Sequence, residues 1–344
     1  MGLNQNTWKL NQWYDQDVAG NVSYTGARQL WAWGYNTAGG LGQNNRTDYS
    51  SPVQVGGGGI GSFGELGGTD IGIASVGDDT IGAIQSDGTL WVIGINDQGQ
   101  LGQNDLTHHN FSSPVQIPGT WDQVEMGWDY SAAINTDGEL WMWGYQGANP
   151  NGTLGQNEGS TKYSSPVQVP GTTWRNITTG QVTVFATKTD GTLWAWGGQN
   201  DAGCLGLNEG GSWSQNMRSS PTQIPGTTWD RASVNSTSSH ATRTDGTLWS
   251  WGINGNGQLG LSNNTNYSSP VQVGSGTDWS VVTNGSSSST FGLKTDGTLW
   301  SWGYNVYGQL GLNTGGPGTN VNSPSQIPGT DWSHISGGSY AAIA

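Results

Sequence analysis

The residues best suited to metal or nucleophilic chemistry are four histidines and a single cysteine. His108 and His109 are adjacent in a loop near Asp105, which would supply half of a metal site. Zinc sites normally combine four ligands at regular spacings, and no cysteine or further histidine stands nearby. We therefore favour solvated loop histidines over a metal site. Cys204 cannot form an internal disulfide and occupies a position where other copies of a repeat carry Gln or Thr, so we expect a structural role.

Asp-Gly pairs recur along the chain and invite comparison with calcium-binding loops. They lack the alternating Asp or Asn ligands and the terminal Glu of such a loop, and turn formation accounts for them. Their positions are 87–88, 137–138, 190–191, 245–246 and 296–297. The sequence contains no Gly-x-Ser-x-Gly nucleophile elbow, P-loop or dinucleotide fingerprint. It therefore predicts a protein that is not an enzyme and that uses no metal and no cofactor.

Aromatic side chains are better candidates, because exposed aromatics among Asn and Ser suit contacts with proteins or saccharides. The candidates in loops are Tyr35, Tyr145, Tyr304 and Tyr307 after a recurring Trp-Gly, Trp128 and Tyr130 in another loop, and Trp213 in an insertion. The alternative is that the tyrosines only pack along a rim. Residues 1–29 add Trp8, Trp13 and Tyr14, which are too many aromatics for a free tail. This leading segment either caps the fold or anchors a partner.

The net charge of the chain limits the classes of partner that it can bind. The 344 residues include 24 acidic and 10 basic side chains, for a formal net charge of −14. These are too few cations for a nucleic-acid interface driven by counterion release, or for a polybasic membrane contact. No apolar run reaches the ~18 residues of a membrane-spanning helix, and the first residues do not resemble a signal peptide. We expect no nucleic acid and no membrane insertion.

The elements that must position these residues belong to a repeat about 50 to 60 residues long. Each copy carries a Leu-Trp pair, beginning at Leu30, Leu90, Leu140, Leu193, Leu248 and Leu299. A Gly-x-Leu-Gly loop and a Ser-Pro-x-Gln run follow it in the same order every time. A period of this length, sustained along the chain, indicates one repeat domain over residues 30–344.

One copy reads as four short strands. Residues 121–124 and 132–135 are strand-like runs, and an Asp-Gly hairpin turn joins the second run to 140–144. Residues 165–169 form an outer strand, whose proline fits a strand start or an edge. Four antiparallel strands in each copy describe a propeller blade. The predicted fold is all-β, a six-bladed β-propeller of four-stranded blades.

The two ends of the chain complement each other within this pattern. Residues 339–344 stop midway through a blade, just before the place of an Asp-Gly turn, and residues 29–33 begin just after it. We expect these strands to pair and to close the ring, because closure removes edges that would otherwise pair with other chains. The alternative is seven blades, the seventh completed by the leading 29 residues.

The combination of Asp-Gly-Thr-Leu-Trp-x-Trp-Gly, Gly-Gln-Leu-Gly and Ser-Pro-x-Gln resembles the regulator of chromosome condensation repeat family, over residues 30–344. This resemblance implies a β-propeller closed by strands from both termini. The founding member exchanges guanine nucleotide on a small GTPase while held on nucleosomes, and related propellers inhibit β-lactamases or act as binding modules. The founding role needs a basic tail and nucleosome-contacting arginines, which this acidic chain lacks. No functional residue of the family transfers by motif, and fold alone does not select a function.

The amino-acid composition suggests where the protein acts. Richness in Gly, Asn, Gln, Ser and Thr, with few lysines, is similar to surface proteins of marine bacteriophage particles. We therefore expect a non-catalytic binding and display propeller on a virion, as a phage-type tail, fibre or capsid-decorating protein. Its partners would be other structural proteins of a larger assembly, or a host surface protein or glycan. Two alternatives stay open: a cytoplasmic regulator of a GTPase or enzyme that acts through the propeller rim, and a secreted lectin-like module.

Overall fold

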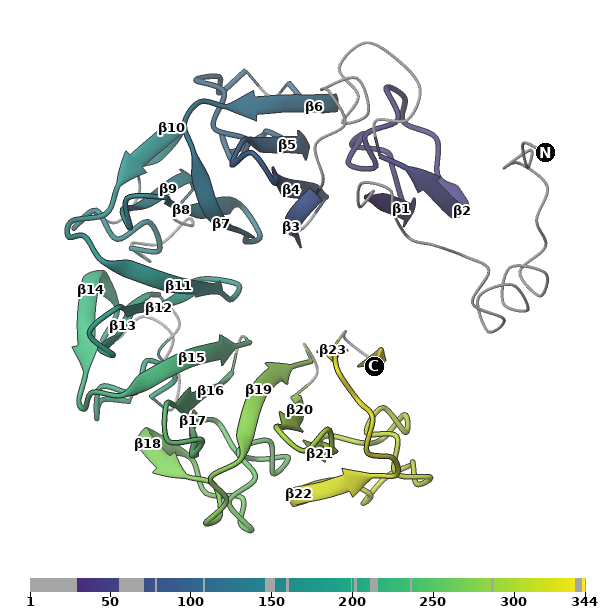
Figure 1. Cartoon of the computed structure of the whole chain (residues 1–344), viewed down its shortest axis with the longest axis vertical. Coiled ribbons are helices and arrows are strands. Elements are labelled where there is room, and N and C mark those ends of the chain that lie inside the picture. Colours follow the sequence, from purple (N-terminus) through teal and green to yellow (C-terminus); the bar gives the residue numbers. More distant parts are fainter. Residues whose placement is uncertain are drawn as a thin grey trace.

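The computed structural model describes residues 30–344 except 56–70, 78, 108, 146–151, 159–160, 199, 201–202, 211–215, 236, 286–287, 338–341 and 344. The described residues form 24 β-strands, arranged as an arc of antiparallel sheets around a central axis (Figure 1). Within this described part, no helix is long and apolar enough to cross a membrane. Residues 1–29, predicted to be an anchor or a cap, lie outside the described residues.

Five sheets have four strands each, and we number them blades 2 to 6 in chain order. Blade 2 contains β3 (Ile71–Val76), β4 (Thr80–Gln85), β5 (Leu90–Gly94) and β6 (Phe111–Ile117), and blade 3 contains β7 (Trp121–Met126), β8 (Tyr130–Asn135), β9 (Leu140–Tyr145) and β10 (Lys162–Gln168). Blade 4 contains β11 (Trp174–Thr179), β12 (Thr183–Lys188), β13 (Leu193–Gly197) and β14 (Arg218–Ile224). Blade 5 contains β15 (Trp229–Val234), β16 (Ser238–Arg243), β17 (Leu248–Gly252) and β18 (Tyr267–Gln272), and blade 6 contains β19 (Trp279–Asn284), β20 (Ser289–Lys294), β21 (Leu299–Gly303) and β22 (Val321–Ile327).

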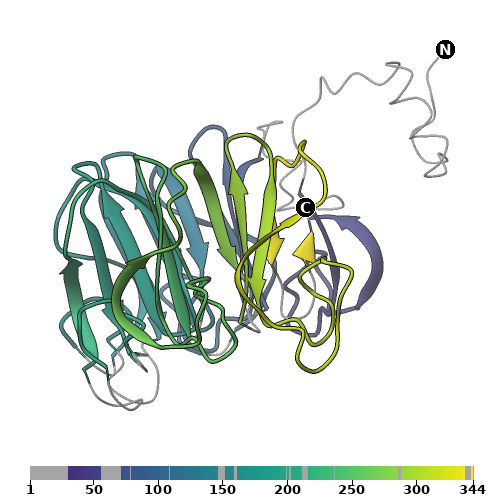
Figure 2. The same ribbon diagram turned by 90° about the horizontal axis from the view of Figure 1, so that it is seen from below.

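The register of each blade defines two rims. In blade 3, Trp121 pairs with Asn135 at one end of the sheet, where the Asp-Gly turn lies, and Tyr130 pairs with Gly144 at the other. The other complete blades repeat this register. We call the end with the Asp-Gly turns the turn rim, and the opposite end the loop rim. Seen from the side, the sheets stand next to one another with their strands running between the rims (Figure 2).

Tryptophans form the core between neighbouring blades. The second tryptophan of each Trp-x-Trp-Gly is fully buried in blades 3 to 6 and donates its Nε1 proton to a backbone carbonyl of the preceding blade. These bonds, each 2.9 Å long, are Trp143 to Gln100, Trp196 to Thr153, Trp251 to Cys204 and Trp302 to Gln258. These hydrogen bonds link each blade to the one before it, within a core that also contains leucine, isoleucine, valine and methionine side chains.

The glycine and asparagine that follow the tryptophan shape the next loop. Gly197 has a φ of 114°, and a Cβ there would collide with the carbonyl oxygen of Val182, so only glycine fits. In the five copies whose residue at this position the structure describes, a buried asparagine then accepts a hydrogen bond from the backbone N–H of the Gly-x-Leu-Gly leucine, as Asn254 does from Leu259 at 3.0 Å. The long loop is therefore held by an internal amide in place of regular secondary structure.

Two further sheets, of two strands each, lie near the ends of the chain and outside blades 2 to 6. They are β1 (Trp31–Gly34) with β2 (Tyr49–Gln54), and β23 (Ser336–Gly337) with β24 (Ala342–Ile343). The prediction of an all-β propeller with four-stranded blades is confirmed by the five complete sheets. The predicted pairing of the two ends is not found among the described residues, because β1 pairs only with β2 and β24 only with β23. β24 is only two residues long, which offers a short edge for such a pairing.

Candidate functional site

The innermost strands of the blades enclose a cavity of about 360 Å³ on the propeller axis. β3, β7, β11, β15 and β19 contribute its lining together with β12, and the lining mixes apolar side chains such as Val282 with polar ones such as Gln123, Asn176 and Arg231. A cavity of this size accepts a small molecule or a few side chains of a partner.

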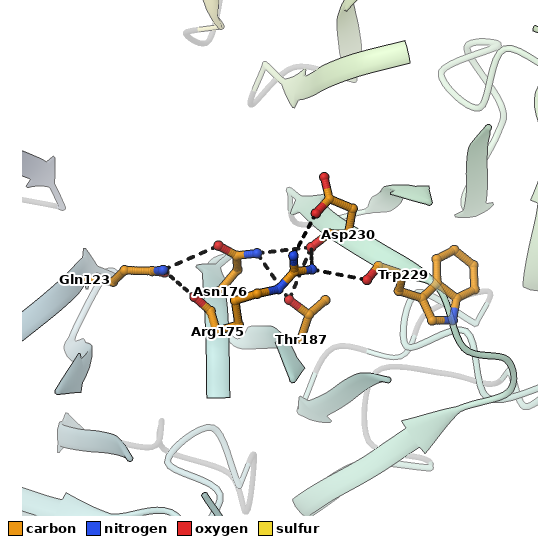
Figure 3. A network of polar contacts seen from close by, with 6 residues as sticks. All are labelled: Gln123, Arg175, Asn176, Thr187, Trp229 and Asp230. Carbon is orange, nitrogen blue, oxygen red and sulfur yellow. Dashed lines mark hydrogen bonds and ion pairs between the residues drawn. The ribbon is translucent and has the colours of Figure 1, made fainter. Parts of the chain in front are cut away.

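A polar network crosses three blades beside this cavity (Figure 3). The Arg175 guanidinium donates to the Trp229 and Asp230 carbonyls and forms an ion pair of 3.0 Å with the Asp230 carboxylate. Asn176 also donates to the Asp230 carbonyl, and the Gln123 amide donates to Arg175 O and Asn176 Oδ1. Because most acceptors are backbone atoms, the network fixes the blades relative to one another. Its groups are engaged internally and offer a ligand little.

Glu125 is the acidic residue of the cavity lining. Ser75 Oγ donates to its Oε2 at 3.3 Å and accepts from the backbone N–H of Met126 at 2.9 Å. Burial raises the pKa of the Glu125 carboxyl to about 7, and the Ser75 hydrogen bond offsets part of that rise. The residue is thus poised to change charge near neutral pH.

The loop rim displays several of the predicted aromatic residues. Tyr35 is 63% exposed, Trp128 46% and Tyr307 66%. The Tyr307 ring meets Tyr304 edge to face, with 6.2 Å between the centroids. Tyr145 is half-buried, and Lys162 Nζ lies 4.9 Å from its ring centroid. Trp128 and Tyr145 belong to blade 3 and the Tyr304–Tyr307 pair to blade 6, so the structure divides the aromatics between separate blades.

The remaining predicted aromatics have other outcomes. Tyr130 is buried, with 2% exposure, because its hydroxyl donates to the Gly180 carbonyl of the next blade at 2.8 Å. The expectation that Tyr130 is displayed to a partner is corrected: it is an inter-blade contact. Trp8, Trp13, Tyr14 and Trp213 lie outside the described residues.

The candidate metal and nucleophilic residues are placed as follows. His109 is exposed and its Nδ1 lies 3.1 Å from Asp105 Oδ2, whereas His108 lies outside the described residues. No group of three or more His, Cys, Asp or Glu side chains comes together in the part of the chain that the structure describes. Cys204 is buried, and its Sγ lies 2.9 Å from the carbonyl oxygen of Thr237. That position suits a packing role.

The sequence argument missed the polar residues of the inner strands. Arg175 and Asp230 occupy the second position of β11 and β15, directly after the first-strand tryptophan. The signal in the sequence is the charged residue that follows Trp174 and Trp229, and it becomes meaningful only when the two repeats are placed side by side.

Comparison with known proteins agrees with this architecture. The family model described as "Regulator of chromosome condensation (RCC1) repeat" matches residues 87–134, 245–291 and 296–344. The RCC1 domain-containing protein RUG3, mitochondrial, from Arabidopsis thaliana is 30% identical over 245 residues, which cover 66% of this chain and 52% of that protein. The chain thus spans about half the length of this relative.

Solved structures are similar over almost the whole chain. The crystal structure of human WBSCR16 superimposes with a TM-score of 0.74 at 18% identity, covering 91% of this chain and 82% of that one. Yeast RCC1 (Prp20), in a crystal structure with Kap60 bound, gives a TM-score of 0.73 at 19% identity, covering 92% and 76%. At such identities the likeness concerns the fold. The described chain has the fold of a β-propeller, and its segments 87–134, 245–291 and 296–344 are similar to regulator of chromosome condensation (RCC1) repeats.

Proposed function

We propose that this propeller is a non-catalytic regulator that binds partner proteins through its loop rim. The observation that carries the proposal is the exposure of large aromatic side chains there, with Tyr307 at 66% and Trp128 at 46%. Aromatic residues are enriched in protein interfaces and dominate their binding energy, whereas a monomer gains nothing from exposing them. A partner that covers Trp128 or Tyr307 would bury apolar area on a chain that is otherwise rich in small polar residues.

The comparisons support a regulator more than a virion component. Yeast RCC1 (Prp20) has been crystallised with Kap60 bound, so a propeller of this fold engages another protein. Neither RUG3 nor WBSCR16 is described as a virion protein. The regulator of a GTPase or enzyme is therefore the favoured alternative of those that the sequence left open, and the virion and lectin interpretations keep only their compositional argument.

The proposal is tested by affinity purification of the full chain from its source cells, with mass spectrometry and size-exclusion chromatography. We expect one protein in stoichiometric complex, lost in the double variant Trp128→Ser and Tyr307→Ser. Ile73→Ser, which changes an apolar residue of the cavity lining that is 40% exposed, serves as the control and should keep the complex. Co-purification with particles, retention on a glycan array, or binding that survives the double variant would contradict the proposal.

A further inference from the structure

Blades 4, 5 and 6 each hold a basic side chain over a pair of tryptophans at the turn rim. The Lys188 Nζ lies 4.5 Å from the ring centroid of Trp174 and 4.7 Å from that of Trp194. The equivalent distances are 4.3 and 4.1 Å for Arg243 over Trp229 and Trp249, and 4.9 and 4.7 Å for Lys294 over Trp279 and Trp300. Cation–π attraction holds each of these side chains over its two indole rings.

An aspartate faces each of these cations. The hydrogen bonds from Thr192 hold the pKa of Asp190 below its usual value, and the charge of Lys188 lowers it further. The pair of Asp245 with Arg243 and the pair of Asp296 with Lys294 behave in the same way. Blades 4, 5 and 6 therefore carry the same set of groups at the turn rim: two indole rings, the carboxylate of an Asp-Gly turn and a cation.

Blade 3 has the rings and the carboxylate but no cation. Asn135 stands at the position of Lys188, Arg243 and Lys294, at the end of the second strand. Its side chain turns into its own hairpin, donating to Glu139 Oε2 at 2.8 Å and accepting from the backbone N–H groups of Asp137 and Glu139. Asn135 therefore does not supply the charge that its counterparts supply.

A second substitution leaves a donor open at the same rim of blade 3. Trp194, Trp249 and Trp300 each donate their Nε1 proton to the hydroxyl of a threonine two residues earlier, at 2.9 Å. Blade 3 carries Glu139 at that position, and its carboxylate accepts from Asn135 instead. The Nε1 atom of Trp141 is buried with no hydrogen-bond partner. An unpaired buried donor costs about 1–3 kcal/mol, which a backbone carbonyl beside the side chain of a bound partner would relieve.

The groove of blade 3 is also the more open one. Its cavity measures about 650 Å³ and is lined by Trp121, Trp141, Asn135 and Asp137, with Gln116 and Pro166 of the outer strands. The equivalent groove between blades 5 and 6 measures about 460 Å³, and Lys294 is part of its lining. The two linings share their tryptophans and their outer-strand glutamine and proline, and Asn135 of the larger groove stands where the smaller one has Lys294.

We propose that the groove at Trp121 and Trp141 binds a lysine or arginine side chain of a partner protein, which takes the place that Lys188, Arg243 and Lys294 take in their own blades. The exposed Asp137 carboxylate faces the incoming charge. The formal net charge of −14 attracts basic segments to the propeller and accelerates their encounter with it. This site lies at the turn rim and does not depend on the loop-rim aromatics of the proposed function.

The first test measures the charge requirement of the groove. A dye-labelled glycine pentapeptide with one central lysine and blocked ends is titrated with the full chain, and binding is followed by fluorescence anisotropy. We expect one site per chain, and at least about tenfold weaker binding when the lysine is Nε-acetylated. Equal affinity for the acetylated peptide, or displacement by a neutral oligosaccharide, would overturn the assignment of a cation.

Two variants locate the site. Asn135→Lys gives blade 3 its own cation and should weaken peptide binding at least about tenfold. Thr265→Lys, on an exposed loop of blade 5, adds the same charge elsewhere and should change the affinity less than about twofold. Lys294→Asn empties the groove of blade 6 and should raise the number of sites from one to two.

The outcomes separate this site from the loop rim. Equal loss in Asn135→Lys and Thr265→Lys would show a general charge effect and would overturn the proposal. So would an unchanged stoichiometry in Lys294→Asn, a variant that tests the proposal even if Asn135→Lys fails to fold. The double variant of Trp128 and Tyr307 should bind the peptide as the unmodified chain does, so failure of the loop-rim proposal leaves this one standing.

Discussion

The indole Nε1 of Trp302 in blade 6 donates a 2.9 Å hydrogen bond to the backbone carbonyl of Gln258 in blade 5. The same oxygen lies 3.0 Å from His240 Nε2 and accepts a 3.0 Å hydrogen bond from Thr290 Oγ1. One carbonyl thus gathers contacts from both blades. Because the site is buried, each group there is costly to remove.

Trp302→Phe should lower the free energy of unfolding by about 2–3 kcal/mol, because it removes a buried donor and leaves a cavity between blades. Trp300→Phe is the matched control. Its Nε1 bonds Thr298 within its own turn and its ring is only half-buried, so we expect a loss of about 1 kcal/mol or less. Urea denaturation of the two variants measures the difference, and equal losses would contradict the inter-blade role of Trp302.

Much of the fold follows from local patterns in the sequence. The run 140–144 corresponds to β9 (Leu140–Tyr145), and the Asp-Gly at 137–138 forms the turn before it. Such features are readable because a hairpin is set by neighbouring residues and by positive φ, which is 74° at Gly138. The repeat of these patterns then dictates the propeller.

Contacts between repeats could not be predicted in the same way. Arg175 and Asp230 are 55 residues apart, and nothing in either local pattern shows that their side chains meet. Tyr130 was expected to be displayed in a loop between strands together with Trp128, yet it lies in β8 and the next blade buries it. The groove of blade 3 is open because Asn135 replaces the cation of the other blades, and no local pattern around Asn135 shows which residues are its counterparts.

Ring closure predicts that the last ten residues stabilise the propeller. Trp33 is 60% exposed, whereas its counterparts in blades 3 to 6 are buried and bonded to the preceding blade. In blades 3 to 6 the acceptor is the residue before the leucine of the Gly-x-Leu-Gly loop, so in a closed ring the acceptor for Trp33 would be the carbonyl of Gln309 in blade 6. If the ends pair, deletion of residues 335–344 should lower the melting temperature by about 5 °C or more. Deletion of the first ten residues is the control, and a calorimetric melt unchanged by the C-terminal deletion would rule closure out.

His240 should make the protein less stable in mild acid. Burial lowers its pKa to about 4, whereas the unfolded chain has the ordinary value of about 6.5. The unfolded state therefore binds more protons between these values, and this contribution to stability is lost as the pH falls through that window. Phe185 and Phe291 occupy the equivalent positions of blades 4 and 6, so His240→Phe should fold. In urea denaturation, the stability of this variant relative to the unmodified chain should be higher at pH 5 than at pH 7, and the same difference at both pH values would contradict this assignment.

Glu125 should act in the opposite direction over an overlapping range. Its folded pKa of about 7 lies above the ordinary value of 4.5, so the folded state holds the proton longer and its stability falls as the pH rises through this window. The two effects oppose each other in the unmodified chain, which should show a flat profile between pH 5 and pH 7. His240→Phe should then expose a fall in stability with rising pH, on the order of 1–3 kcal/mol, and Glu125→Gln should expose a rise.

Glu139→Gln, in the turn of the same blade, should leave the profile flat. Parallel profiles for the two single variants would show that neither buried group controls stability in this range.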